Sequence, residues 1–179
     1  DQASVILFTR PRRFGKTLAL DMLKSYFEKT ETDTSVYFKD KRIWTCGEKY
    51  QKYQGMYPVI SITFKDAMFA DWGSTFEAIT SIIRDEFMRH EELFDSDKIN
   101  LVEREYLERL QRNELSEVEY SRSLLNLCRM LNKHHQTKIV ILIDEYDTPI
   151  QQGHSKGFYN EVITFMRSFM SGGLKDNTV

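Results

Sequence analysis

The apolar and polar positions along the chain follow two different periods, which predicts a fold built from strands and helices. Apolar runs at residues 4–9 and 138–143 predict strands buried within a sheet, and the alternation over 58–64 predicts another. Spacings of three and four from residue 71, and again over 157–171, predict helices, as does the broad apolar face over 15–28. The alternation of strands and helices along the chain predicts an α/β protein with a parallel sheet that is covered by helices on both sides.

Two further helices are predicted between the second and third strands. Residues 97–112 read as a highly charged, solvated helix, and Ser116 and Glu119 have the spacing of a capping box at the start of the next. A length of 179 residues fits one domain. We therefore expect a single domain over 1–179 with a helical insertion at about 70–136. The abrupt apolar start and the stop after Gly172 suggest a piece excised from a longer protein.

Composition and charge narrow the class of protein. Hydrophobic residues make up 41% and charged residues 29%, which is typical of a soluble globular domain. The net charge of −2 gives no general attraction to nucleic acid or to an anionic membrane, and no apolar run reaches the ~18 residues of a membrane span. Cys46 and Cys128 stand far apart without metal-ligand spacing. These features predict a cytoplasmic protein with free thiols and neither membrane nor nucleic acid as a partner.

A candidate phosphate loop joins the first strand to the first helix. A nucleoside triphosphate needs backbone amides at a helix N-terminus, a lysine for its β- and γ-phosphates and a hydroxyl for Mg²⁺. Gly15, Lys16 and Thr17 supply these groups in the right order, so we predict ATP and Mg²⁺ as ligands. Arg10 stands where the usual motif has its first glycine, so the strict pattern fails there. The predicted nucleotide-binding residues are Arg12, Arg13, Phe14, Gly15, Lys16, Thr17 and Leu18.

The arginines of this loop allow more than one interpretation. Arg10, Arg12 and Arg13 could contact the nucleotide or a neighbouring subunit. They could equally form a solvated basic turn or pair with nearby carboxylates.

Two carboxylates end the third predicted strand, and they complete the candidate site. Carboxylates at the mouth of a buried strand are costly unless something uses them. We predict that Asp144, with Thr17, holds Mg²⁺ and that Glu145 acts as general base on the attacking water. Glu145 and Lys16 are thus the predicted catalytic residues. The plain alternative for Asp144 is a helix cap, and Asp147 either caps a turn before Pro149 or supports the site through hydrogen bonds.

Several strings in the chain resemble one protein family. The run LFTRPRRFGKTL at 7–18 and the string IDEYDTP at 143–149 resemble the AAA-ATPase-like family of bacterial proteins, as do YPVI at 57–60, FKD at 64–66 and LKDN at 174–177. The resemblance spans nearly the whole chain, and arginine in place of the first glycine is usual in that family. It implies a P-loop NTPase three-layer sandwich of the additional-strand type, related to AAA+ ATPases.

The resemblance also implies features that lie outside this sequence. In such a fold, a further strand carrying a polar sensor residue inserts between the strands at 4–9 and 138–143. The chain stops before it, so we expect an incomplete sheet or one completed by another chain. Family members often carry a C-terminal region that is similar to a restriction-endonuclease-type nuclease. An attached domain of that kind and further copies of the chain are therefore the implied partners, besides nucleotide.

Taken together, the motifs predict Mg²⁺-dependent ATP binding and hydrolysis that drives or gates an attached effector. The alternative is a non-hydrolysing nucleotide-sensing switch or scaffold module.

Overall fold

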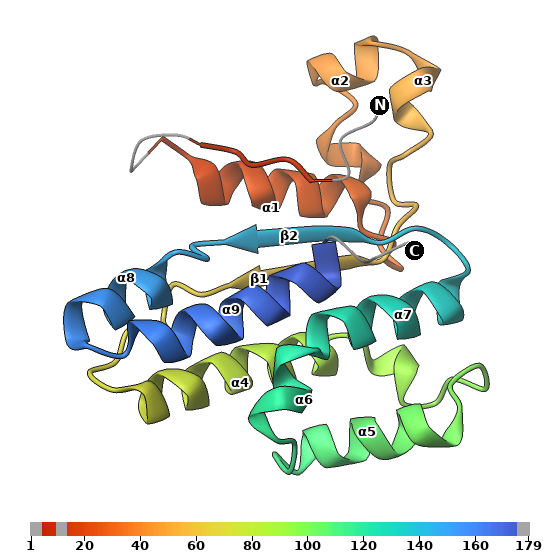
Figure 1. Ribbon diagram of the computed structural model, residues 1–179. Helices are drawn as coiled ribbons and strands as arrows, with labels where there is room; N and C mark the ends of the chain where they lie inside the picture. The colour runs from red at the N-terminus through yellow and green to blue at the C-terminus, as the bar shows by residue number, and fades with distance from the viewer. Residues whose placement is uncertain (1–4, 10–13, 175–179) are drawn as a thin grey trace.

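A small parallel sheet organises the computed structural model, which describes residues 5–9 and 14–174. Its strands are β1 (Val59–Thr63) and β2 (Val140–Asp144), which pair from Val59 opposite Val140 to Thr63 opposite Asp144. Both strands therefore end at the same edge of the sheet (Figure 1). A parallel pair needs a crossover connection, and here helices supply it.

Helices make up most of the rest of the described chain. Before β1 lie α1 (Lys16–Phe27), η1 (Thr34–Tyr37), α2 (Arg42–Thr45) and α3 (Glu48–Gln51). Between the strands lie α4 (Trp72–Met88), η2 (Glu91–Leu93), α5 (Leu101–Gln111), α6 (Glu117–Ser121) and α7 (Ser123–His135). After β2 come α8 (Thr148–Lys156) and α9 (Tyr159–Leu174).

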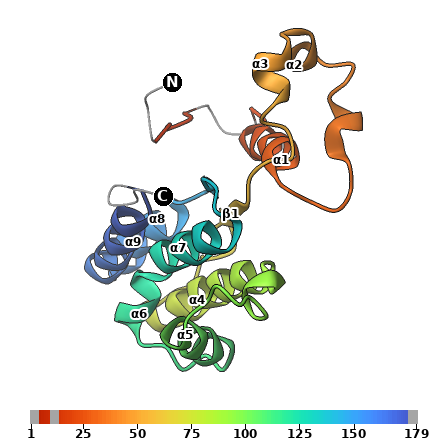
Figure 2. The same cartoon turned by 90° about the vertical axis from the view of Figure 1, so that its right-hand side faces the viewer.

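The two faces of the sheet are covered unequally. Helices α4, α7 and α9 pack on one face, whereas α1 lies on the other and α2 and α3 project beyond it (Figures 1 and 2). Helix α1 keeps three large apolar side chains exposed, namely Leu18 at 64%, Met22 at 51% and Leu23 at 42%. The stabilising core therefore lies almost wholly on the side of α4, α7 and α9.

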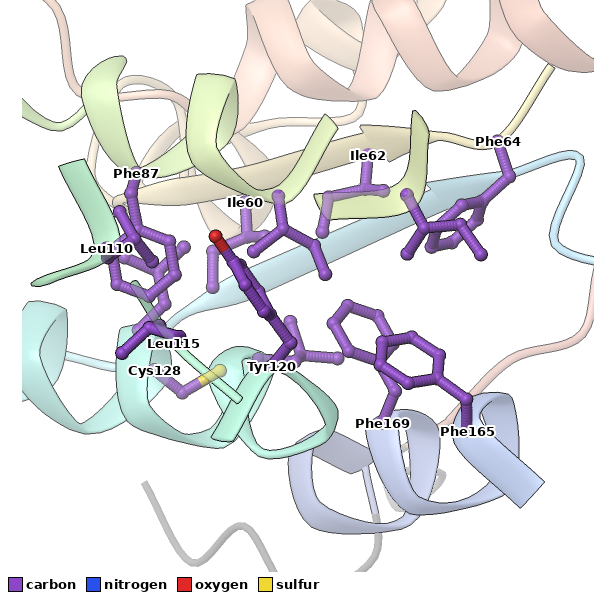
Figure 3. Close-up of a cluster of buried hydrophobic side chains, with 14 of the residues drawn as sticks. Ile60, Ile62, Phe64, Phe87, Leu110, Leu115, Tyr120, Cys128, Phe165 and Phe169 are labelled. Atoms are coloured by element: carbon purple, nitrogen blue, oxygen red, sulfur yellow. The ribbon is translucent and has the colours of Figure 1, made fainter. Parts of the chain in front are cut away.

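That core is built from the inward-facing side chains of β1 and the apolar stripes of the helices. Ile60 and Ile62 of β1 and Phe64, directly after it, stand at alternate positions and are fully or nearly fully buried (Figure 3). Phe165 and Phe169 of α9 stack against each other beneath them. Burying one such side chain contributes about 1.5–3 kcal/mol relative to leaving it exposed. The periodicity of residues 71–87 is confirmed as α4, which begins after an Asp71 cap.

The outer edge of β1 is capped by side chains instead of a third strand. The Ser61 N–H donates to Glu86 Oε1 at 2.7 Å, and the Arg89 guanidinium donates to the Val59 carbonyl. Glu86 is only 5% exposed, and it also accepts from Arg89. Burial opposes its ionisation, but hydrogen bonds from His90 and Arg89 outweigh this and hold the pKa of Glu86 below its usual value. A charged cluster thus satisfies backbone groups that an edge strand leaves open.

Two strand predictions need correction. Residues 5–9 form no strand, and the Val5, Ile6, Leu7 and Phe8 side chains are 49–79% exposed. A strand is stabilised by ladder hydrogen bonds, and in the described part of the chain the second edge of β2 has no strand beside it. For the same reason β2 is not buried on both faces: of its residues, Leu142 alone is buried.

The helix predictions were better. The first helix and the Ser116–Glu119 capping box are confirmed, and α5 begins later than expected because Asn100 and Glu103 form a second capping box. The segment 148–156, which carried no strong apolar period, forms α8 and joins α9 through Gly157 in a left-handed conformation. The protein is a mixed α/β protein compatible with a P-loop-like fold. Its described sheet has two strands, so the three-layer sandwich stays a prediction.

Removing Glu86 should destabilise the protein strongly. Glu86→Ala removes the buried acceptor of the Ser61 N–H and one of the carboxylate partners of Arg89, and breaking a buried ion pair costs about 3–5 kcal/mol. Glu86→Gln keeps one acceptor oxygen and should cost less than the alanine variant. Urea unfolding measures both, with exposed Glu105→Ala as the control, expected within about 0.5 kcal/mol of the native chain. Equal stability of the Glu86→Ala and Glu105→Ala variants would contradict the edge-capping role.

Candidate phosphate and metal site

A single hydrogen bond joins the two halves of the predicted site. The Thr17 Oγ1 donates to Asp144 Oδ2 at 2.6 Å, across 127 positions of sequence. Thr17 belongs to the first turn of α1, and Asp144 is the last residue of β2. The loop–helix junction and the acidic strand end therefore meet at the carboxyl edge of the sheet.

The N-terminus of α1 has the form of an anion site. Gly15 stands at the N-cap with φ 69°, and no side chain caps the helix. The Ala19 N–H donates to the Gly15 carbonyl, so the helix is hydrogen-bonded from its first turn. The first amides of any helix lack partners within it and carry the positive end of the helix dipole. Together with Lys16, these amides can bind a phosphate group.

The backbone at Glu145 is strained, and the strain directs its side chain. Glu145 has φ 53°, a left-handed conformation that non-glycine residues seldom adopt. Its N–H donates to Asp144 Oδ1 at 3.0 Å, and its Oε2 accepts from Thr148 Oγ1 at 3.2 Å. The sharp turn after β2 thus orients both carboxylates. Outliers of this kind gather at functional sites, where surrounding contacts sustain them.

A cavity of about 840 Å³ opens beside these groups, within the range of small-molecule sites. Its lining comes from the start of α1, with Gly15, Lys16, Thr17 and Leu18, from the loop after β1 and from one polar face of α8. The remaining lining residues are Lys65, Met68, Glu145, Thr148, Gln151, Gln152 and Ser155. A smaller cavity of about 350 Å³ lies at the opposite end of β1, next to Pro58 and Val59, and is lined by the charged cluster around Arg89.

The donor atoms at the junction suit a hard divalent cation. Mg²⁺ prefers oxygen ligands and is usually bound through one or two protein groups, with water and substrate phosphates completing its octahedron. The Thr17 hydroxyl and the Asp144 carboxylate already converge within hydrogen-bonding distance. Over residues 5–9 and 14–174, no three His, Cys, Asp or Glu side chains converge on one metal position. The arrangement therefore fits a metal shared with phosphate oxygens better than a metal enclosed by protein.

The structure brings together some of the predicted residues and not others. Lys16, Thr17, Leu18 and Glu145 line the cavity with Gly15, whereas Asp144 lies behind Thr17. Phe14 is 63% exposed and does not line the cavity. Arg10, Arg12 and Arg13 lie outside the described residues. Asp147 is at the N-cap position of α8, where its carboxylate accepts from Gln151 Nε2 at 2.6 Å and accepts no capping hydrogen bond from the helix backbone.

Several lining residues of the cavity were not predicted from the sequence. Thr148, Gln151, Gln152 and Ser155 recur at spacings of three and four, which is the pattern of one helix face. Because these side chains are polar, a search for apolar periods does not find them. Lys65 belongs to the FKD string at 64–66 and to no nucleotide motif.

These features define the class of protein: a mixed α/β protein with a small parallel sheet, compatible with a P-loop-like fold. The chain belongs to the AAA-ATPase-like family, described as predicted AAA-ATPase, whose model matches residues 1–179. No curated protein and no solved structure was found to match it. Within the part of the chain that the structure describes, no helix has the length and apolar character to cross a bilayer.

The conformation of Gly15 should be needed for stability as well as for binding. A Cβ at this position would touch nothing within 4 Å, so the cost of Gly15→Ala is conformational, about 1–2 kcal/mol for a left-handed residue. Gly15→Asn should cost less, because asparagine tolerates this region. Free energies of unfolding from urea titration test the order. An alanine variant as stable as the native chain would show that Gly15 does not need the left-handed conformation.

Proposed function

We propose that this domain binds Mg·ATP and hydrolyses it to ADP and phosphate. Lys16 and the first amides of α1 would hold the phosphates, while Thr17 and Asp144 would hold the metal. The observation that carries the proposal is the hydrogen bond from Thr17 Oγ1 to Asp144 Oδ2. It joins a hydroxyl at a phosphate-binding helix to a carboxylate at a strand end, which are the two groups that share Mg²⁺ in a P-loop site.

Glu145 is the proposed general base. Its carboxylate lines the cavity beside Lys16 and has one described partner, Thr148, at 3.2 Å. It would take a proton from a water whose oxygen bonds to the γ-phosphorus as the bond to the β–γ bridging oxygen breaks. Most of the remaining acceleration would come from positive groups placed where negative charge gathers.

We further propose that hydrolysis drives or gates an attached effector. Support comes from α1, which carries the phosphate-binding end and exposes the Leu18, Met22 and Leu23 side chains. A movement of this helix on loss of the γ-phosphate would change an apolar surface that another domain could contact. The alternative, a nucleotide-sensing switch without turnover, uses the same binding site and lacks only the step assigned to Glu145.

Lys16→Ala should remove most of the affinity for Mg·ATP. Charge-assisted hydrogen bonds of the lysine to phosphate oxygens are lost, which corresponds to a roughly 10- to 100-fold rise in Kd. Isothermal titration calorimetry measures the effect. Lys138→Ala is the matched control, because Lys138 is exposed just before the amino end of β2, at the opposite edge of the sheet. An unchanged Kd in the Lys16→Ala protein would remove the phosphate site from this position.

Glu145→Gln should bind Mg·ATP as the native protein does but turn it over about 10²–10⁴-fold more slowly, since amide cannot accept the proton. Phosphate release after rapid mixing measures the rate, and calorimetry measures the affinity. Glu161→Gln, on exposed α9 surface, should change neither quantity. Tight binding without turnover in the native protein itself would favour the switch module, and an unchanged rate in Glu145→Gln would exclude Glu145 as the base.

A further inference from the structure

A lysine that the phosphate motif does not include also lines the cavity. Lys65 follows the end of β1 by two residues and lines the same space as Lys16, Thr17 and Glu145. The strand register places it beside the acidic strand end, because Thr63 pairs with Asp144. The residue between Thr63 and Lys65 is also held to β2, because the Phe64 N–H donates to the Asp144 carbonyl at 3.1 Å.

The backbone around Lys65 is held firmly, although its side chain is exposed. Phe64 before it and Ala67 after it are both 0% exposed, and the Ala67 N–H donates to the Phe64 carbonyl at 3.1 Å to close the turn. Gln152 Nε2 donates to the Phe69 carbonyl at 3.0 Å, which attaches the end of this loop to α8. The position of the Lys65 Cα is therefore fixed by contacts on both sides, and only its own side chain is free to adjust.

The ammonium group of Lys65 has no acceptor among the residues that the structure describes. The one hydrogen bond of this residue is from its backbone N–H to Thr63 Oγ1, at 3.4 Å. Among the residues that the structure describes, the charged side chains lining the cavity are Lys16, Lys65 and Glu145, which together carry a net positive charge. Asp144 lies behind Thr17 and is already bonded to the hydroxyl and to the Glu145 N–H. Two lysines from different elements, the start of α1 and the loop after β1, thus line one space.

We propose that Lys65 binds the terminal phosphate of the nucleotide and so distinguishes a triphosphate from a diphosphate. This rests on the proposed function, because it places the phosphates at the N-terminus of α1. Amides and Lys16 at that end contact the phosphates from the side of the helix. Lys65 approaches from the sheet edge, beside Glu145, where the γ-phosphate and the attacking water must both lie. A lysine at this position would interact most strongly with the γ-phosphate, which carries the negative charge that a triphosphate has in addition to a diphosphate.

Affinities for two nucleotides test the proposal without requiring turnover. Calorimetry with Mg·ATP and with Mg·ADP is carried out on the native protein, Lys65→Met, Lys65→Arg and Lys138→Met. Lys65→Met should weaken Mg·ATP at least tenfold and change Mg·ADP by less than about twofold, because only the triphosphate loses a charge-assisted bond. Lys65→Arg keeps the charge and should retain most of the discrimination. The Lys138→Met control should change neither affinity.

Three outcomes would count against the proposal, and they differ from each other. An unchanged ATP affinity in Lys65→Met, or equal losses for ATP and ADP, would overturn the assignment of Lys65 while leaving the phosphate site in place. Absence of ATP binding to the native protein would overturn the proposed function and this inference with it. Thermal unfolding without nucleotide serves as the folding control, and Lys65→Met should match the native midpoint because the side chain is exposed.

Discussion

The parallel pairing of β1 with β2 is the constraint on which the rest of this structure depends. Parallel strands end at the same edge of a sheet, so the register that sets Thr63 beside Asp144 also decides what can gather there. That edge holds the turn after β2 and the loop that carries Lys65, and the N-terminus of α1 reaches it. A candidate ligand site beyond the carboxyl ends of the parallel strands follows from this arrangement.

A sheet of two strands needs other elements to satisfy its edges, which further strands do in a wider sheet. Here α4 supports the sheet twice, once by packing Ile79, Ile83 and Phe87 under β1 and once by capping the outer edge through Glu86 and Arg89. Arg89 also pairs with Glu28 at the end of α1, so the same side chain connects the helix on the open face to the core. Removal of this cluster would therefore affect the edge of β1 and the attachment of α1 together.

Much of this arrangement could be predicted from local signals, because local physics decides it. The two strands, α4 and the Ser116 cap depend on periodicity and on neighbours three or four residues away. The Gly15-Lys16-Thr17 turn and the acidic strand end were predicted from chemistry that needs those groups in that order. What could not be predicted depends on the sheet as a whole. An apolar run such as 5–9 is a strand only where another strand pairs with it.

The same reasoning explains the misses within the site. Glutamate seldom adopts a positive φ, so nothing in the sequence indicates the strained backbone at Glu145. The structure alone reveals it. Lys65 and the polar face of α8 belong to no nucleotide motif, and they reach the cavity through the strand register and through Gln152 holding Phe69. The meeting of Thr17 with Asp144 across 127 positions, by contrast, was expected from the sequence, because the chemistry of Mg²⁺ needs both groups.

The site lies where a well-packed half of the molecule meets a lightly packed one. Its carboxylates belong to the end of β2 and the turn after it, whereas its amides and Lys16 belong to α1, whose exposed apolar side chains show how little of that helix is packed. A ligand bound to both the end of β2 and the N-terminus of α1 would join two elements that the protein itself connects through few contacts. A ligand that binds only when the two elements are together stabilises that arrangement by mass action. Magnesium and phosphate oxygens placed between Thr17 and Asp144 would have this effect. On this view the position of α1 is the part of the structure most open to control by nucleotide, because it is the part least determined by the core.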